Sequence, residues 1–441
     1  MFQGGSMRVN VVKRAKKLLT PALGWDTELV VRRARGAEVE TKGGKKFLDF
    51  SCGTATTNIG HCHPKVVSAA KHQINNLVHA GGVYFYDSIV KVAEELKAIT
   101  PGAIDMFFFS NSGAEAIEGA MKLAKSVTHR PAILSFRGAF HGRTLGCVSI
   151  SSSNVKYRKN YEPLLSSVYR APFANCYRCP YGQHRDSCAF ECIQFIRDVF
   201  KHEVHPEQTA AIIFEPVQGE GGYIVPPSEF IKFLRDFSRE HGIMLIADEV
   251  QTGFGRTGKW FACDHFGIEP DIIVMAKGIA SGFPLSALGA PTKIMKQWAP
   301  GAHGTTFGGN PVSCAASVAT IKAIREEKML ENCQKLSTEA FSRLQKMKND
   351  NPLVGDVRGL GFMIGVEFVD RDGGPNPEAT EKVLNQCLEA GLILISCGVS
   401  GNVIRFIPPL NITREQLHRG LDIFETSLQA VAEEELGVAH A

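Results

Sequence analysis

The sequence predicts an α/β fold centred on a large, doubly wound, mostly parallel β-sheet. Two observations point to it: short apolar runs recur between about residues 64 and 292, and segments with helical spacing separate them. Short apolar strands that alternate with helices are typical of a parallel sheet covered on both faces. Because ligands bind beyond the carboxyl ends of such strands, the residues after each run are the first candidates for a functional site.

The elements can be predicted in chain order. A basic segment at 9–19 predicts an N-terminal helix, and the Gly-punctuated residues 36–50 predict short strands. A helix over 114–127, with apolar positions at helical spacing, joins the first two strands of the main sheet. The strands predicted for that sheet span 106–109, 132–136, 211–214, 243–247 and 272–275.

The C-terminal third has a different pattern. A long helical stretch is predicted over 313–349, and Gly-punctuated strands are predicted over 362–368 and 403–407. These elements indicate a second, smaller α/β domain that begins near Pro311.

The composition excludes several classes of protein. The 441 residues include 49 Lys or Arg and 45 Asp or Glu, for a net charge of +4, with 44% hydrophobic and 21% charged residues. These values exclude extensive disorder, and they provide no strong field for nucleic acid or a membrane surface. Twelve cysteines are too dilute for a disulfide scaffold, and we expect no secretory signal or membrane span. The expected location is cytoplasmic.

The first candidate site residues lie where the strand at 106–109 ends. Ser112 and Glu115 form a predicted capping box, and Gly113 leaves the backbone open. A helix start of this kind suits a phosphate, although an ordinary N-cap has the same pattern.

Two further strand ends carry polar and aromatic residues. Phe140, His141 and Arg143 follow the strand at 132–136, and they could stack on a flat heterocycle and hold a carboxylate; alternatively, Phe140 packs into the core. Glu215 and Glu220 follow the strand at 211–214, where they either face the cleft or lie in a solvated turn.

The most informative strand ends carry Asp248 and Lys277. A carboxylate at the end of a buried strand must be paired, because burying an unpaired charge is costly. Lys277 follows an apolar run, and a desolvated lysine has a lowered pKa that allows its amine to attack a carbonyl. A phosphate site, an aromatic partner, a lysine and a carboxylate together match the needs of pyridoxal phosphate.

Over nearly its whole length the sequence resembles the class III pyridoxal-phosphate aminotransferases, in the subgroup that acts on 4-aminobutyrate and other ω-amino acids. The resemblance implies fold type I, with a large cofactor domain and a small domain made from both chain ends. It also implies a homodimer with active sites at the interface. The implied divisions are 1–62 and 313–441 for the small domain and 63–312 for the large one. The motifs that carry the resemblance are Leu48-Asp49-Phe50, Gly60-His61-Cys62-His63-Pro64, 247–258 and Arg405-Phe406-Ile407-Pro408-Pro409.

The resemblance also implies roles for single residues. Lys277 forms the Schiff base with the cofactor, Asp248 pairs with the pyridine nitrogen, and Phe140 stacks on the ring. The rest of the implied cofactor-binding set is Ser112, Gly113 and Ala114 at the phosphate, Val250 and Gln251 at the ring, Thr306 at the partner subunit's phosphate, and His141 and Glu215.

Three residues are expected to bind substrate. By resemblance, Arg405 holds the α-carboxylate of glutamate or 2-oxoglutarate, and Glu220 pairs with Arg405 when an ω-amine is bound. Arg143 matches the arginine that takes the distal carboxylate, although a structural salt bridge is an alternative. An arginine fork binds a carboxylate bidentately, so it fixes which amine reaches the reacting carbon.

The predicted function is transamination, in which an amino acid or ω-amine gives its amino group to 2-oxoglutarate or another keto acid. Racemisation or epimerisation with the same cofactor is the alternative, because some relatives with an insertion like 175–192 are racemases. That insertion holds Cys176, Cys179, Cys188 and Cys192, whose spacing suggests a zinc site, a local disulfide or unligated surface thiols. We favour the interpretation without metal. The sequence does not identify the amino donor.

Overall fold

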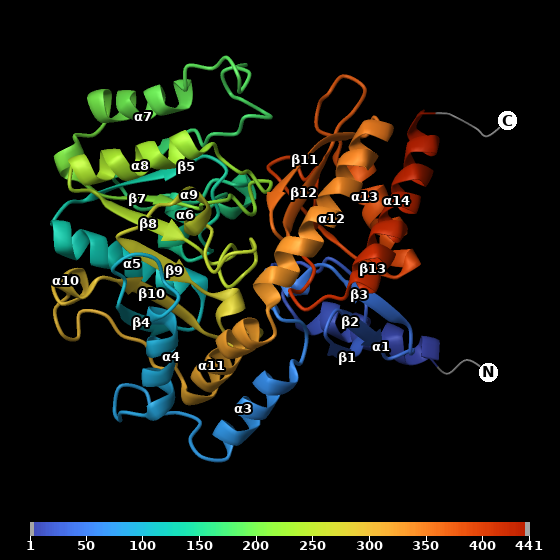
Figure 1. The fold of residues 1–441 in the computed structure, drawn as a ribbon, viewed down its shortest axis with the longest axis horizontal. Helices are drawn as coiled ribbons and strands as arrows, with labels where there is room; N and C mark the ends of the chain where they lie inside the picture. Colours follow the sequence, from blue (N-terminus) through green and yellow to red (C-terminus); the bar gives the residue numbers. More distant parts are fainter. Residues whose placement is uncertain (1–3, 437–441) are drawn as a thin grey trace.

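The chain forms one part around a large central sheet and another in which the two chain ends meet (Figure 1). The computed structural model describes residues 4–436. In Figure 1, the blue N-terminal strands lie beside the orange and red C-terminal elements, away from the green and teal middle of the chain. Within the described residues, no helix combines the length and the apolar character needed to cross a membrane.

The central sheet has seven strands in the described part of the chain, in the order β4-β10-β9-β8-β7-β5-β6. Neighbouring strands from β6 to β9 run parallel, whereas β10 is antiparallel to β9 and β4. The mostly parallel, doubly wound sheet predicted from the sequence is therefore confirmed. The strands are β4 (Met106–Ser110), β5 (Ala132–Phe136), β6 (Val168–Ala171), β7 (Thr209–Phe214), β8 (Met244–Asp248), β9 (Ile272–Met275) and β10 (Ser286–Ala290).

Helices cover both faces of this sheet. α7 (Glu191–His202) and α8 (Ser228–Glu240) share an apolar cluster with Leu245 of β8, whereas α5 (Gly113–Thr128) shares another with Ile246. Successive residues of β8 are thus buried on opposite faces, so this strand reads as a continuous apolar run. The other helices of this part are α3 (Pro64–Ile74), α4 (Asp87–Lys97), α6 (Leu145–Ile150), α9 (Cys263–Phe266), α10 (Thr292–Met295) and α11 (Pro311–Glu326).

Sequence analysis missed β6 and β10. The sequence of β10 is Ser-Ala-Leu-Gly-Ala. Its glycine is needed because a side chain at Gly289 would lie 2.8 Å from the ring of Phe107 on the neighbouring strand. β6 reads Val-Tyr-Arg-Ala and is half-buried at the edge of the sheet. Both strands therefore lack the apolar run that reveals their neighbours.

The two chain ends share a four-stranded sheet in the order β1-β2-β3-β13, in which β13 runs parallel to β3. A second four-stranded sheet, β11-β12-β15-β14, lies entirely in the C-terminal third. The strands are β1 (Val31–Arg35), β2 (Glu38–Thr41), β3 (Lys46–Asp49), β11 (Val354–Leu360), β12 (Met363–Phe368), β13 (Leu392–Ile393), β14 (Ile395–Cys397) and β15 (Val403–Phe406). The helices are α1 (Gly4–Leu18), α2 (Cys52–Ala55), α12 (Met329–Asp350), α13 (Pro377–Ala390) and α14 (Arg414–Leu436).

The helical stretch predicted over 313–349 is divided into two helices. The structure has two helices, α11 and α12, separated at Glu327 and Lys328, and Lys328 has a left-handed backbone with φ 51°. α11 packs on α3 and α4, whereas α12 packs on β11 and α14, so the chain must turn between them. The domain divisions at 62/63 and 312/313 stay predictions, and their outer ends at 1–3 and 437–441 lie outside the described residues.

Candidate active site

A cavity of about 1090 Å³ opens where the carboxyl ends of the central strands meet segments from both chain ends. Ligand pockets commonly measure roughly 300–1,000 Å³, so this cavity has room for a cofactor and a substrate together. Every site residue predicted from the sequence except Thr306 lines it: Ser112, Gly113, Ala114, Phe140, His141, Arg143, Glu215, Glu220, Asp248, Val250, Gln251, Lys277 and Arg405.

Asp248 is the last residue of β8 and only 5% exposed. Its Oδ2 lies 2.7 Å from Nδ1 of His141, and its Oδ1 accepts a hydrogen bond from the backbone N–H of Val250 at 3.0 Å. Burial opposes a charge on His141, but the bond to Asp248 outweighs it and raises the histidine's pKa. His141 and the backbone of Val250 therefore fix the carboxylate of Asp248 in the cavity lining, where it can stabilise a protonated heteroaromatic nitrogen.

Lys277 follows β9 in a short 3₁₀ turn, and part of its surface is accessible from the cavity. Its backbone has φ 45°, a left-handed conformation that is costly for a residue with a side chain and typical of functional sites. Burial, assisted by the positive charge of Arg405, lowers the pKa of its amine to about 8. Although most of the amine is protonated at pH 7, its neutral, nucleophilic fraction is therefore much larger than that of an ordinary lysine.

Glu215 follows β7 and braces two loops of the cavity. Its Oε1 accepts a hydrogen bond from the N–H of Phe140 at 3.0 Å, and its Oε2 accepts one from the N–H of Gly219 at 2.9 Å. Burial raises the pKa of this carboxyl to about 7; His141 opposes the shift and Asp248 adds to it. Glu215 thereby fixes both the loop of Phe140 and the turn that leads to Glu220.

The start of α5 forms another wall of the cavity. Ser112 caps the helix, and its capping box with Glu115 is present in both directions. A side chain at Gly113 would lie 3.1 Å from Val250, so glycine keeps this corner open. The ordinary N-cap is thus present, and because the capped helix of 16 residues begins at the cavity, the anion site considered in the sequence analysis stays a prediction that this geometry allows.

Gln251 is fixed by a buried tyrosine. The hydroxyl of Tyr223 donates a hydrogen bond to Oε1 of Gln251 at 2.7 Å. A side chain at Gly219 would lie 2.3 Å from Nε2 of Gln251, so the glycine makes space for the amide. The amide group is held at one position in the cavity wall.

The cavity lining also includes the two predicted substrate arginines. Arg405 of β15 is 5% exposed; its Nη1 lies 3.2 Å from Oε2 of Glu220, and its Nη2 donates to the carbonyl of Ser396 at 2.6 Å. The hydroxyl of Tyr157 donates to Oε1 of Glu220 at 3.3 Å. The guanidinium of Arg143, which is exposed, lies 4.5 Å from the centre of the Tyr157 ring. A chain of contacts thus links the two arginines.

Some site residues differ from the sequence-based expectation. Thr306 is exposed in the loop before α11 and does not line this cavity, so its predicted role stays a prediction. Sequence analysis missed Tyr157 and the wall segments 22–26 and 396–401. Tyr157 ends a 3₁₀ turn, 22–26 lie in a loop, and 396–401 run from the end of β14 into the next turn; none of them carries a motif.

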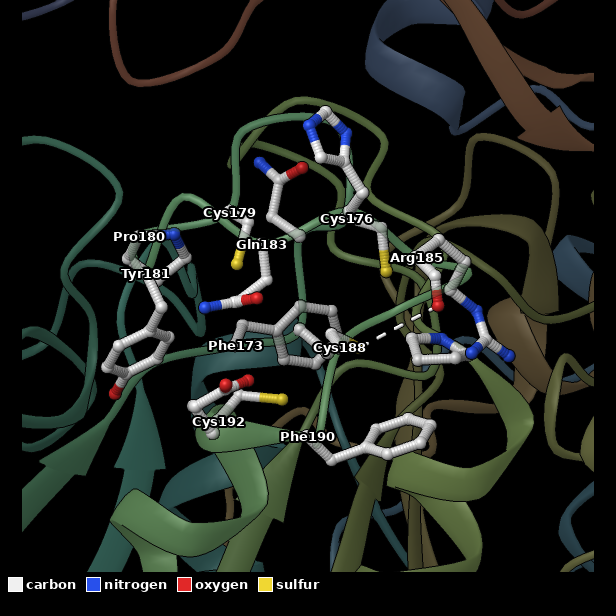
Figure 2. A pocket seen from close by; sticks show the side chains of 15 residues that line it. Phe173, Cys176, Cys179, Pro180, Tyr181, Gln183, Arg185, Cys188, Phe190 and Cys192 are labelled. Atoms are coloured by element: carbon white, nitrogen blue, oxygen red, sulfur yellow. Dashed lines mark hydrogen bonds between the residues drawn. The ribbon is translucent and has the colours of Figure 1, made fainter.

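The four cysteines of the insertion surround a second, small cavity of about 30 Å³ (Figure 2). All are free thiols, and burial raises the pKa of Cys192 to about 11. Across residues 4–436, no group of His, Cys, Asp and Glu side chains is arranged to hold a metal ion. The structure therefore gives the zinc interpretation no support in this part of the chain.

Comparison with known proteins adds to this geometry. The family model described as "Aminotransferase class-III" matches residues 23–428. The chain is 40% identical over 432 residues to the alanine/serine racemase of Pyrococcus horikoshii, covering 96% of this chain and 91% of that protein. It is 39% identical over 429 residues to the 4-aminobutyrate aminotransferase of Mycobacterium leprae, covering 96% of each.

Solved structures show the same fold. A PLP-bound amine transaminase from an uncultivated Pseudomonas species has a TM-score of 0.87 and 29% sequence identity, covering 94% of this chain and 99% of that one. A Bacillus anthracis aminotransferase has a TM-score of 0.89 and 29% identity, covering 97% of this chain and 100% of that one.

Proposed function

The chain belongs to the class III aminotransferase family, and on this premise we propose that it transfers an amino group from an amino acid or a 4-aminobutyrate-like ω-amine to 2-oxoglutarate or another keto acid. The transfer uses pyridoxal 5'-phosphate and follows a ping-pong order. The observation that carries the proposal is a single cavity that holds the amine of Lys277, the anchored carboxylate of Asp248 and two arginines.

The residues of the cavity fit this cofactor. Gly113 and the start of α5 offer N–H groups for the phosphate, and Phe140 offers an aromatic face. When bound, pyridoxal phosphate accepts the electron pair that is released as the substrate's Cα–H bond breaks. Asp248, held by His141, keeps a proton on the facing heteroaromatic nitrogen. Lys277 anchors the group, and its neutral amine takes the proton from Cα.

The two arginines select the substrate. Arg405 binds the α-carboxylate of glutamate or 2-oxoglutarate, and Arg143 binds the distal carboxylate. With 4-aminobutyrate, whose only carboxylate lies at the Arg143 end, Glu220 stays paired with Arg405 and neutralises it. The salt bridge between Glu220 and Arg405 supports this assignment.

Borohydride treatment of the holoenzyme tests the cofactor assignment. The reduced group should be found by peptide mapping on Lys277, and Lys277→Ala should lose both the adduct and all turnover. Lys156 lines the same cavity and provides the matched control, since Lys156→Ala should retain the adduct. An adduct on any other residue would contradict the proposal.

Racemisation is a second candidate, because the alanine/serine racemase is as similar to this chain as the aminotransferases. Incubation of single-enantiomer amino acids and ω-amines, with and without 2-oxoglutarate, separates the two activities. Product that forms only with the keto acid supports transamination. Inversion of the α-carbon without a keto acid supports racemisation.

We also propose a homodimer in the cytoplasm. Thr306 precedes the exposed Phe307, whose ring contacts His79. A few residues after His79 in the sequence, Val83, Tyr84 and Phe85 are exposed as well. A second copy that covers these side chains would bring Thr306 to its partner's phosphate site. Mixing Lys277→Ala subunits with Thr306→Ala subunits should restore activity; no recovery despite subunit exchange would indicate sites built within one chain. Cell fractionation tests the location.

A further inference from the structure

Tyr157 contacts Arg143 and Glu220, which are predicted to bind substrate, and Phe140, which is predicted to face the cofactor. Its ring packs edge-on against Phe140 at 5.4 Å between centroids, and the guanidinium of Arg143 lies over the same ring at 4.5 Å. Its hydroxyl donates to Glu220 at 3.3 Å. A 3₁₀ turn capped by Asn154, whose side chain accepts a hydrogen bond from the N–H of Lys156, holds this tyrosine at the cavity.

Glu220 occupies one terminal nitrogen of Arg405 and so competes with a substrate carboxylate for this arginine. Nη1 of Arg405 is engaged by Oε2 of Glu220, and Nη2 donates to the carbonyl of Ser396. A substrate carboxylate can pair end-on with both Nη atoms of Arg405 only after Glu220 leaves. Because Oε1 of Glu220 accepts from Tyr157, that departure also breaks the tyrosine's hydrogen bond.

The hydroxyl of Tyr157 is suited to donate this hydrogen bond to Glu220. Burial and the negative charge of Glu220 raise the pKa of Tyr157, so it remains a protonated donor at neutral pH. The guanidinium of Arg143 stays over the ring through a cation–π contact, which orients an otherwise exposed side chain.

We propose that Tyr157 is a specificity-determining residue: its hydroxyl holds Glu220 on Arg405 and so disfavours an α-carboxylate, while its ring positions Arg143 for a distal carboxylate. The inference rests on the proposed function. It explains how one wall can favour an ω-amine over glutamate as the donor without any change at the cofactor end.

The test compares half-reactions of the holoenzyme with glutamate and with 4-aminobutyrate, followed by the absorbance of the cofactor. Tyr157→Phe keeps the ring and removes the hydroxyl, so glutamate displaces Glu220 more easily. The ratio of kcat/KM for glutamate to that for 4-aminobutyrate should rise about 3- to 10-fold, through a lower KM for glutamate at unchanged kcat. Tyr157→Leu also removes the ring and should raise the KM for 4-aminobutyrate about 3- to 10-fold.

Two controls separate this role from a merely structural one. In a Glu220→Ala background, Tyr157→Phe should no longer change the KM for glutamate, because the hydroxyl acts through Glu220. Tyr161 is exposed and lies four residues further along the chain. The matched variant Tyr161→Phe should leave kcat and KM unchanged for both glutamate and 4-aminobutyrate.

Two results would overturn the inference alone: an unchanged substrate ratio in Tyr157→Phe, or an equal effect of Tyr157→Phe with and without Glu220. A wild-type holoenzyme that converts neither substrate would overturn the proposed function, and this inference would fall with it.

Discussion

The proposed cofactor end and the proposed substrate end of the cavity are built differently. At the cofactor end, His141, Glu215 and Asp248 are between 3% and 6% exposed, and ring or backbone nitrogens hold both carboxylates. At the substrate end, the carboxylate of Glu220 is held by the side chains of Arg405 and Tyr157 alone. One end is fixed by backbone N–H groups together with the buried ring of His141, and the other by side chains that can change rotamer.

This difference matches two chemical tasks. Proton transfer at Cα requires groups that stay in one geometry for every substrate, and buried groups with several hydrogen bonds provide it. A ping-pong cycle, by contrast, brings two different molecules to the same wall, so its ion pairs must open and close. We therefore expect substitutions at the cofactor end to affect all substrates, and substitutions at the substrate end to affect them selectively.

The largest effect is expected for Asp248→Asn. The cofactor should remain bound, but kcat should fall at least about 10³-fold for every substrate, because a neutral amide does not keep the facing heteroaromatic nitrogen protonated. Glu249→Gln is the matched control: this buried carboxyl accepts the N–H groups of Ala262 and Cys263 and does not line the cavity. It should lower the thermal stability and leave the turnover per bound cofactor unchanged. Normal turnover of Asp248→Asn would make the residue structural.

Next in size is Arg405→Ala. Loss of a charge-assisted, bidentate contact in a buried site should cost about 2–4 kcal/mol, or roughly 30- to 1,000-fold in kcat/KM, for glutamate and 2-oxoglutarate. The kcat/KM for 4-aminobutyrate should fall much less, because this substrate places no carboxylate at Arg405. Half-reaction rates measure both. An equal loss for the two donors would contradict the selective role of this end.

The same contrast explains what the sequence could predict. The positions of Asp248 and Lys277 near strand ends follow from apolar runs, so the sequence could predict five of the seven strands and two candidate residues in the cavity, whereas β6 and β10 lack such runs. Tyr157 was not, because its contact with Glu220 joins positions 63 residues apart and depends on the orientation of two loops. The break at Lys328 was missed for a related reason: no Gly or Pro marks it, and packing on different neighbours imposes it.

A smaller effect is expected for Arg143→Ala. Since this side chain is exposed and oriented by the Tyr157 ring, its ion pair with a distal carboxylate is partly screened. The KM for 4-aminobutyrate should rise about 3- to 30-fold, less so at high salt, whereas an amino acid with an apolar side chain should be unaffected. Arg137→Ala, at an exposed position outside the cavity, is the control. If Arg143→Ala leaves the KM values for 4-aminobutyrate and glutamate unchanged, racemisation gains support.

The smallest effect concerns pH. In cofactor-free protein, a Lys277 amine with a pKa of about 8 is mostly protonated at pH 7 and mostly neutral at pH 9. Since only the neutral amine attacks a carbonyl, the rate at which the protein captures pyridoxal phosphate should rise about tenfold over this range and then level off. A lysine with an ordinary pKa would instead show a rise of about a hundredfold with no plateau, and stopped-flow absorbance distinguishes these profiles.

The Arg405→Ala variant sharpens this last prediction, because it connects the two ends of the cavity. Burial is the main cause of the lowered pKa of Lys277, and the charge of Arg405 is the next. Without that charge, the negative charges of Asp248 and Glu220 act unopposed, so the pKa should rise and the plateau should move to higher pH. A plateau that stays near pH 8 would mean that burial alone sets the pKa, and that the substrate end changes independently of the cofactor end.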